Sequence, residues 1–309
     1  MYINLELDDA SCKRRIYDIY RAMGIKPLNA KNLEIWNLRG RVLPLDMLTP
    51  KIIRRCADRH LNAIIIDPIY KVLTGDENAA ADMAKFCNYF DRIARDCDCA
   101  VIDCHHHSKG GQGGKRSMDR ASGSGVFARD PDALLDMIEL DAENAKSVKA
   151  NNLAFNAIVK EIADEVDGWE GAEGVTDRLL AICSAKLPRQ RQNQLCAIRD
   201  RIYSSSQIAT AWRIESTLRE FPSGKPIDIW FDFPLHTVDD GLLADAMPAD
   251  SDAVIQRKAK GKKAAKPSKE KAIRNLIDES FQDATIAAIP VSDLIDKLDK
   301  ELGDVSKRK

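Results

Sequence analysis

Along the first 140 residues, segments whose hydrophobic positions have helical spacing alternate with segments whose hydrophobic positions have the pattern of β-strands. Spacings of three and four apolar positions predict helices at residues 9–23 and 79–96, and a third at 50–59 with Thr49 as its cap. Short apolar or alternating runs between them predict strands at 1–7, 33–38, 63–67, 133–140 and one beginning at Ala100. Strands that alternate with helices in this way indicate an α/β fold, with a mainly parallel sheet and flanking helices.

The pattern changes in the second half of the chain. Residues 141–208 are mostly polar with helical spacing, and we expect them to form a helical insertion. Two further β patterns, at 211–219 and 227–233, flank a turn rich in Pro, Ser and Gly at 221–226. We expect this hairpin to close the edge of the sheet, so that the main domain covers residues 1–245.

The C-terminal region has a different composition. Eight Lys and Arg residues lie between Arg257 and Lys271 against the single acid Glu270. This run predicts a basic linker over residues 246–270, and either linker solubility or attraction to a phosphate backbone explains its charge. The apolar positions that follow predict a small helical module at 271–309, for which a winged helix is one option.

Overall composition excludes some classes of protein. The 47 basic and 48 acidic residues nearly cancel, so net charge favours no particular partner. No stretch has the roughly 18 apolar residues of a membrane span, and early acidic residues rule out a secretory signal. Eight scattered Cys in such a chain indicate reduced thiols. These features predict a cytoplasmic protein without a membrane partner.

Two carboxylates end predicted strands. Asp67 follows the apolar run 63–66, where a carboxylate can hold Mg²⁺ through water beside nucleotide phosphates. Glu6 ends the first strand, where it can polarise an attacking water. The alternatives are an Asp that caps its strand and a Glu that faces solvent. Because parallel strands gather ligands at their carboxyl ends, we expect both residues at one edge of the sheet.

Three consecutive histidines, His105, His106 and His107, end the next predicted strand. A polar or cationic residue there can sense a γ-phosphate and relay its loss to the following loop. Metal binding with the nearby Cys97, Cys99 and Cys104 is the alternative. It is disfavoured because Cys97 and Cys99 are closer than the usual zinc spacing, and consecutive strand residues point to opposite faces.

The next loop is rich in glycine and cations. Residues 110–117 superficially resemble a phosphate-binding loop, but Arg116 separates Lys115 from Ser117 and breaks the pattern G-x-x-x-x-G-K-[ST]. We therefore predict that Lys109, Lys115 and Arg116 contact nucleic acid or a neighbouring subunit, with Lys109 also near nucleotide. Arg120 and Arg129 are candidates for an arginine that acts across a subunit boundary, and a solvated surface role is the alternative.

In their order and motifs, these segments resemble the RecA-fold, RepA-type hexameric helicases and related phage and mobile-element AAA-family ATPases. Residues 3–6 resemble the strand of the catalytic glutamate, and 64–68 with 75–78 resemble the Walker B strand and its loop. Residues 105–110 resemble the paired-histidine sensor, and 121–125 with Asp130 resemble the Ser/Gly segment. The resemblance covers about residues 1–140, and the closing hairpin less specifically.

The resemblance implies an ATP- and Mg²⁺-dependent hydrolase of helicase or translocase type that acts on DNA in the replication of a phage, prophage or plasmid. It also implies a ring, a hexamer in the full-length parent, and contacts with other replication proteins. Catalytic roles would fall to Glu6, Asp67, His105, His106 and either Arg120 or Arg129.

Three departures limit what the resemblance implies. The family's phosphate-binding loop should precede Met1, which suggests N-terminal truncation and predicts little or no hydrolysis by this chain alone. Ser122 stands where the family has its arginine finger. The insertion at 141–208 has no counterpart that we can name. The alternatives are a non-catalytic DNA-binding or assembly protein, or an accessory ATPase of a helicase loader or primase.

Overall fold

The computed structural model of the chain describes residues 1–57, 59–108, 111–121 and 125–258. The chain divides into two compact units, Met1–Ser251 and Asp252–Lys309. Of the second unit only residues 252–258 are described, and they are helical. The predicted C-terminal module and residues 259–270 of the predicted basic linker lie outside the described residues. The fold described below is that of the first unit.

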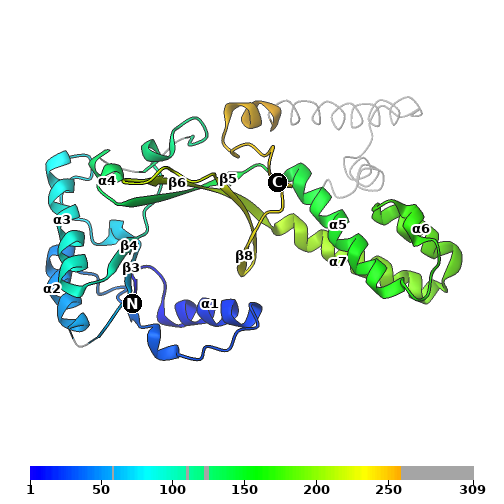
Figure 1. Cartoon of the computed structure of the whole chain (residues 1–309), viewed down its shortest axis with the longest axis horizontal. Helices are drawn as coiled ribbons and strands as arrows, with labels where there is room; N and C mark the ends of the chain where they lie inside the picture. The colour runs from blue at the N-terminus through cyan, green and yellow to red at the C-terminus, as the bar shows by residue number, and fades with distance from the viewer. Residues whose placement is uncertain (58, 109–110, 122–124, 259–309) are drawn as a thin grey trace, which may run out of the picture. The chain divides into compact units, whose positions relative to one another are not determined.

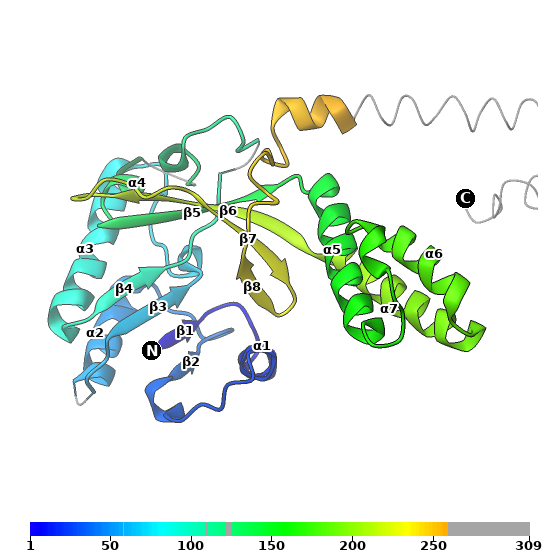
Figure 2. The same ribbon diagram turned by 45° about the vertical axis from the view of Figure 1, so that its right-hand side comes forward.

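The first unit contains a parallel sheet with the strand order β2-β1-β3-β4 (Figure 1, with all four strands labelled in Figure 2). Its strands are β1 (Tyr2–Asn4), β2 (Ile35–Asn37), β3 (Ala63–Asp67) and β4 (Ala100–Asp103). All three strand pairs are parallel, and Asn4 of β1 lies opposite Asp67 of β3. The prediction of an α/β fold with a parallel sheet is confirmed, and the arrangement is consistent with a RecA-like fold.

Three helices connect these strands. α2 (Leu45–Cys56) and α3 (Ala80–Cys97) contact each other and cover one face of the sheet. Ile64 and Ile66 of β3 point to that face and are fully buried in a shared core with Ile52 and Phe86. Alternate strand residues point to opposite faces, which explains why the run 63–66 buries every second side chain completely.

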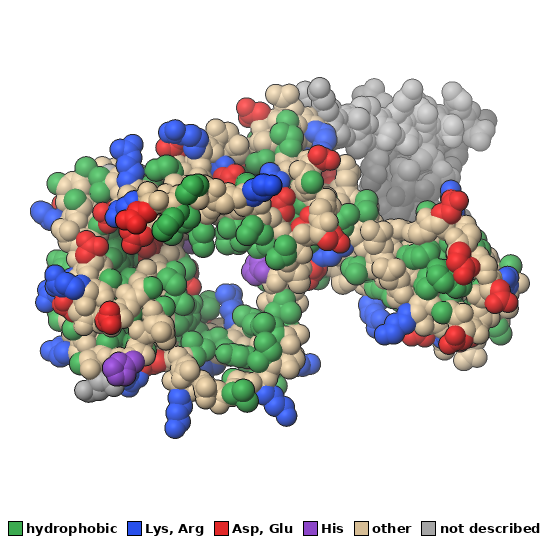
Figure 3. Space-filling view, in the orientation of Figure 1, with side chains coloured by type: hydrophobic (Ala, Val, Ile, Leu, Met, Phe, Trp, Pro, Cys, Tyr) green, Lys and Arg blue, Asp and Glu red, His purple; other side chains and the backbone are tan. Residues whose placement is uncertain are grey.

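α1 (Asp9–Ala22) lies on the opposite side of the sheet from α2 and α3 (Figures 1 and 2). Asp8 caps it by accepting a hydrogen bond from the backbone N–H of Ser11 at 2.9 Å. Cys12 is the buried residue of this helix. Hydrophobic side chains lie on the part of its surface seen in Figure 3. Tyr17 of this helix and its C-cap residue Met23 have 60% and 53% of their surface exposed.

The start of α2 corrects a sequence-based expectation. We predicted a helix from Pro50 capped by Thr49, but the helix begins at Leu45 and contains Pro50 in its interior. The Thr49 hydroxyl instead donates to the carbonyl of Leu45 at 2.7 Å. Leu45 and Leu48 are almost completely buried, and their burial compensates for the backbone hydrogen bond that Pro50 cannot make.

A second sheet is antiparallel, with the order β5-β6-β7-β8. It consists of β5 (Ala133–Leu140), β6 (Thr210–Leu218), β7 (Ile227–Asp232) and β8 (Leu235–Val238). The expectation that the hairpin of residues 211–233 closes the parallel sheet is therefore wrong. That hairpin pairs with β5, whose alternating burial is typical of an antiparallel strand with one solvated face.

Three helices lie between β5 and β6: α5 (Glu143–Ile162), α6 (Thr176–Lys186) and α7 (Arg189–Ile208). They have a core of their own, formed by Ile158, Ile162, Leu179, Leu195 and neighbouring apolar residues. The remaining helices are α4 (Gly125–Arg129) and short 3₁₀ turns at Ala30–Asn32, Ile69–Lys71, Ser117–Asp119 and Trp169–Ala172. Within the described parts of the chain, no helix combines the length and apolarity needed to cross a membrane.

Candidate functional site

The carboxyl ends of β1, β3 and β4 bring polar residues from distant parts of the sequence to one edge of the sheet. Glu6 follows β1, and the Tyr70 hydroxyl, just after β3, lies 3.4 Å from its Oε1. The Tyr70 ring also lies against the ring of His106, which follows β4, with 5.4 Å between the centroids. Tyr70 therefore contacts two of the predicted residues, although no sequence pattern singled it out.

Asn4 determines how the chain leaves β1. Its buried side-chain amide donates to the carbonyl of Leu7 and to Oδ1 of Asn37, each at 2.7 Å. Its Oδ1 accepts the backbone N–H groups of Glu6 and Leu7 at 3.3 and 2.9 Å. This turn directs the Glu6 side chain to solvent, where it is exposed.

Asp67 ends β3, and its carboxylate lies beside two uncharged hydrogen-bond donors, the Tyr2 hydroxyl and the Cys104 thiol. Its Oδ2 accepts a hydrogen bond from the Tyr2 hydroxyl at 2.7 Å. Burial and this carboxylate raise the pKa of Tyr2, so the hydroxyl keeps its proton. Burial, with the charge of Asp67 second, likewise raises the pKa of Cys104 to about 11. Asp67 thus lies among groups that remain protonated at neutral pH.

The donor set around Asp67 fits a magnesium ion bound largely by water. The described residues contain no cluster of three or more His, Cys, Asp or Glu side chains suited to a metal. Mg²⁺ usually keeps several waters and binds one or two carboxylates together with substrate phosphates. Asp67 is the carboxylate at this edge that would hold such an ion.

Asp103 is a further carboxylate at the carboxyl end of this sheet, and the sequence analysis did not select it. It ends β4 and lies directly after Ile102, as Asp67 lies after Ile66. Burial raises its pKa, and the neighbouring His105 opposes this effect. The signal was present in the sequence, because both aspartates end an apolar run in adjacent parallel strands.

The three histidines point to three different environments. The ring of His105 packs edge-on against Phe127 at 5.1 Å between the centroids. His106 is exposed and faces Tyr70. Nε2 of His107 lies 2.8 Å from Oδ1 of Asp136 in β5. Of this run, His106 is therefore the residue beside Tyr70, which in turn lies near Glu6, whereas His105 packs against Phe127 and His107 contacts the second sheet.

The two candidate arginines differ in exposure. Arg120 is buried, with 4% of its surface exposed, and its guanidinium donates to Asp136 and to Glu215, the latter at 2.7 Å. Its guanidinium is held inside this chain by two carboxylates and is not at the surface, which corrects its predicted role as a finger. Arg129, by contrast, ends α4 with an exposed side chain.

The glycine-rich loop is anchored to the rest of the first unit. The backbone N–H groups of Gln112 and Gly113 donate to the carboxylate of Asp250, the second at 2.9 Å. Lys115 Nζ donates to Ser108 Oγ at 2.8 Å. Arg116 is exposed and pairs with Asp119 at 2.9 Å. Lys109 and Ser122 lie outside the described residues.

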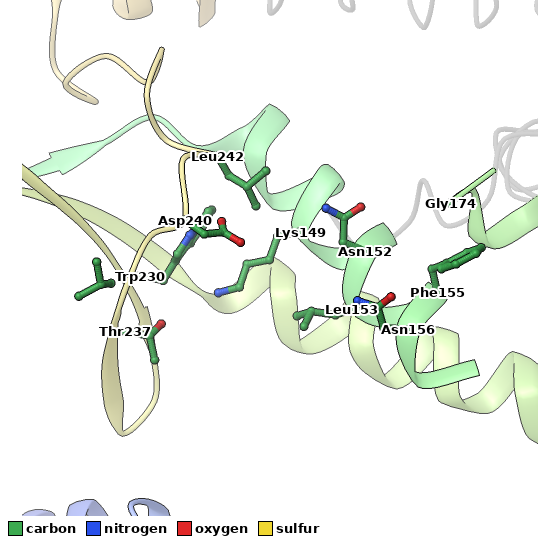
Figure 4. Close-up of a pocket in the computed structure, with 11 residues that line it drawn as sticks. Lys149, Asn152, Leu153, Phe155, Asn156, Gly174, Trp230, Thr237, Asp240 and Leu242 are labelled. Atoms are coloured by element: carbon green, nitrogen blue, oxygen red, sulfur yellow. The ribbon is translucent and has the colours of Figure 1, made fainter. Parts of the chain in front are cut away.

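A separate cleft of about 510 Å³ lies between α5 and the β7–β8 hairpin (Figure 4). Lys149 projects from α5 over the ring of Trp230, 4.3 Å from its centroid. Its Nζ pairs with Asp232 at 2.5 Å. None of the predicted site residues lines this cleft.

Comparison with known families identifies a domain type for the N-terminal part of the chain. Residues 1–112 match the model of a family described as an AAA domain. The matched segment contains β1–β4, α1–α3 and the edge that carries Glu6, Asp67 and the histidines. No curated protein matches the chain. The match supports an ATPase type of protein and leaves the helicase subtype without independent support.

Proposed function

We propose that this chain carries part of the nucleotide-hydrolysing site of a helicase- or translocase-type ATPase that acts on DNA during replication of a mobile element. The observation that supports the proposal is the meeting of Glu6, Asp67 and His106 at the carboxyl edge of one parallel sheet, within the segment that matches an AAA domain. This edge is where α/β proteins of this kind bind phosphates.

Each residue has a distinct role in the proposed site. Asp67 holds Mg²⁺ through water, and the ion neutralises charge on the β- and γ-phosphates of ATP. Glu6 orients and polarises the attacking water, while Tyr70 fixes the direction of its carboxylate. His106 contacts the γ-phosphate, and the ring contact with Tyr70 makes its position sensitive to that of Glu6.

The proposed site needs a phosphate cradle from elsewhere. The 309-residue sequence contains no G-x-x-x-x-G-K-[ST] motif, the loop that surrounds phosphates with backbone N–H groups. We therefore propose that these residues alone hydrolyse little ATP. The same observation favours a second candidate, a DNA-binding or loader-type accessory protein whose nucleotide site is completed by a partner.

Oligomer and DNA contacts complete the proposal. Arg129 is exposed at the end of α4 and can extend to the site of a neighbouring subunit in a ring. The exposed Arg116 in the loop that follows β4 can contact a DNA phosphate, together with Lys109 and Lys115. Only a short stretch of chain separates His106 from Arg116. A change in bound nucleotide that moves His106 can therefore shift the residues that contact DNA.

The test is nucleotide binding and DNA-stimulated ATP hydrolysis, measured for residues 1–309 and for a form that includes any upstream residues of the same reading frame. Asp67→Asn and Glu6→Gln are compared with Asp98→Asn, an equivalent change of an exposed Asp at the opposite end of the sheet. We expect Asp67→Asn to weaken Mg²⁺-dependent nucleotide binding and Glu6→Gln to abolish hydrolysis but not binding. Retained DNA binding with no nucleotide binding in either form would leave the accessory protein as the better interpretation.

A further inference from the structure

The glycine-rich loop that follows β4 holds a carboxylate from a distant part of the chain. The backbone N–H of Gln112 donates to Oδ2 of Asp250, and the backbone N–H of Gly113 donates to its Oδ1 at 2.9 Å. The two oxygens of one carboxylate thus accept two consecutive amides. Successive backbone N–H groups that converge on one anion form a concave site of the kind that binds phosphate. The loop therefore presents an anion site, and Asp250 fills it.

Contacts inside the chain orient these amides. Gln112 is buried, its side-chain amide donates to the carbonyl of Ser108 at 2.5 Å, and its carbonyl accepts a hydrogen bond from Nε of Arg120 at 3.2 Å. A Cβ at Gly113 would lie only 3.0 Å from Oδ1 of Asp250, so glycine gives the carboxylate room for its close approach. Because the contacts of Gln112 with Ser108 and Arg120 do not involve Asp250, its amide should keep this direction when another anion replaces the carboxylate.

A short segment beside β5 carries Asp250 to the loop. Residues 247–249 lie antiparallel to the end of β5, where the N–H of Ala249 donates to the carbonyl of Glu139 at 2.8 Å. The Asp250 side chain is partly exposed, and within the described part of the chain it forms no ion pair with a Lys or Arg. The loop amides therefore stabilise its charge, and a dissolved anion can reach the same amides from solvent.

Cationic side chains lie in the same loop. Arg116 has 86% of its side-chain surface exposed. Nζ of Lys115 donates to the hydroxyl of Ser108 at 2.8 Å and has no acidic partner among the residues that the structure describes. A phosphate group can gain from the amides and from these cations together, whereas Asp250 uses the amides alone. The two anions exclude each other at the amides, because both need the same N–H groups.

We propose that Asp250 is an autoinhibitory residue, whose carboxylate must leave the amides of Gln112 and Gly113 before a phosphate group binds there. A phosphate of DNA is the ligand that we expect, and inorganic phosphate offers the same chemistry. With DNA as the ligand, the inference rests on the proposed function, because Lys115 and Arg116 are its proposed DNA contacts. The exclusion of one anion by the other does not depend on that function.

The test compares Asp250→Asn with Asp252→Asn. Asn keeps the size of the side chain and one acceptor oxygen, but it removes the charge that competes with phosphate. Asp252 is exposed and lies two positions further on, so its substitution changes the net charge equally and serves as the control. Fluorescence anisotropy with a labelled oligothymidine, at one salt concentration and without nucleotide, measures the DNA affinity of both variants and of the unaltered chain.

We expect Asp250→Asn to bind the oligonucleotide about tenfold more tightly than the unaltered chain. The reason is that an apparent affinity falls by the fraction of molecules whose site is free, and the substitution raises that fraction. Asp252→Asn should change the affinity about twofold or less, as for the loss of one exposed charge. An equal or weaker affinity of Asp250→Asn would overturn the proposal, because Asp250 would then only anchor the loop, while the DNA contact itself would stand.

Hydrogen exchange determines where the anion binds. When inorganic phosphate replaces chloride at equal ionic strength, exchange at the amides of Gln112 and Gly113 should slow clearly in Asp250→Asn and little in the unaltered chain. This protection without DNA binding by any form would support the autoinhibited anion site and contradict the proposed DNA contact. If neither phosphate nor the oligonucleotide protects these amides in Asp250→Asn, the proposal is wrong.

Discussion

Nε2 of His107, in the segment that follows β4, lies 2.8 Å from Oδ1 of Asp136 in the middle of β5. The other oxygen of the same carboxylate accepts a hydrogen bond from the guanidinium of Arg120. Asp136 has 5% of its surface exposed, so this contact is shielded from water. One carboxylate therefore fixes both ends of the segment 107–120 to the antiparallel sheet.

We expect Asp136→Ala to lower the free energy of unfolding by about 3 kcal/mol, because removing one partner of a buried ion pair leaves the other charge poorly compensated. Arg120 would retain only Glu215, at 2.7 Å, as its acidic partner. Asp132→Ala is the matched control, since Asp132 is 93% exposed where it pairs with Arg219, and it should cost about 0.5 kcal/mol or less. Urea denaturation measures both changes. Equal effects of the two variants would show that the buried pair adds nothing to stability.

The sequence predicted the parallel sheet and the order of its strands in the chain because buried strands and amphipathic helices have distinct periods. The ends of β3 and β4 could be predicted for the same reason, because the apolar runs end at the polar residues Asp67 and Asp103. The environment of Arg120 was not predictable. Its partners Asp136 and Glu215 lie 16 and 95 residues away, and only the pairing of β5 with β6 brings them together.

The local pattern of hydrophobic and polar residues also did not predict the contacts of Tyr2 and Tyr70. Both tyrosines contact predicted site residues across 64 or 65 positions of the sequence. An isolated Tyr in a strand or turn carries no periodic signal for such a contact. The 211–233 hairpin was assigned to the wrong sheet because its alternating hydrophobic and polar residues fit the edge of either sheet. Which strand it pairs with depends on the tertiary arrangement, which the alternation does not encode.

Gly113→Ala should loosen the anchored loop. A Cβ at Gly113 would lie 3.0 Å from Oδ1 of Asp250 and from Cβ of Pro248, which is too close without displacement of either group. We expect a loss of about 1–3 kcal/mol in unfolding free energy, as for other overpacked positions. Gly114→Ala is the control, because nothing lies within 4 Å of a Cβ there. Limited proteolysis between residues 108 and 120 should accelerate only in Gly113→Ala, and acceleration in both variants would contradict this account.

Asp103→Asn should stabilise the protein at neutral pH. Burial raises the pKa of Asp103 above its ordinary value of 3.8, so the folded state binds its proton more tightly than the unfolded state. The ionised carboxylate therefore costs stability above its folded pKa, and this cost disappears as the pH falls below 3.8. Thermal unfolding from pH 7 to pH 3.5 should show a higher Tm for Asp103→Asn at pH 7 and a difference that shrinks in acid.

The control for this experiment is Asp98→Asn, at an exposed position after α3 where the backbone is left-handed. Asn tolerates that conformation, so any change in Tm should vary little with pH. A Tm difference for Asp103→Asn that stays constant across the same pH range would show that desolvation of the carboxylate is not its cause.

Arg116→Gln tests the proposed DNA contact. Arg116 has 86% of its side-chain surface exposed, and its pair with Asp119 at 2.9 Å is open to solvent, so it can exchange this partner for a phosphate. Each phosphate contact adds close to one unit to the slope of log affinity against log salt, so we expect the variant to bind DNA more weakly at low salt with a slope smaller by about one. Arg95→Gln is the matched control, because Arg95 on α3 is 75% exposed and also pairs with an exposed Asp. If both substitutions lower the slope equally, general charge rather than this loop attracts the DNA.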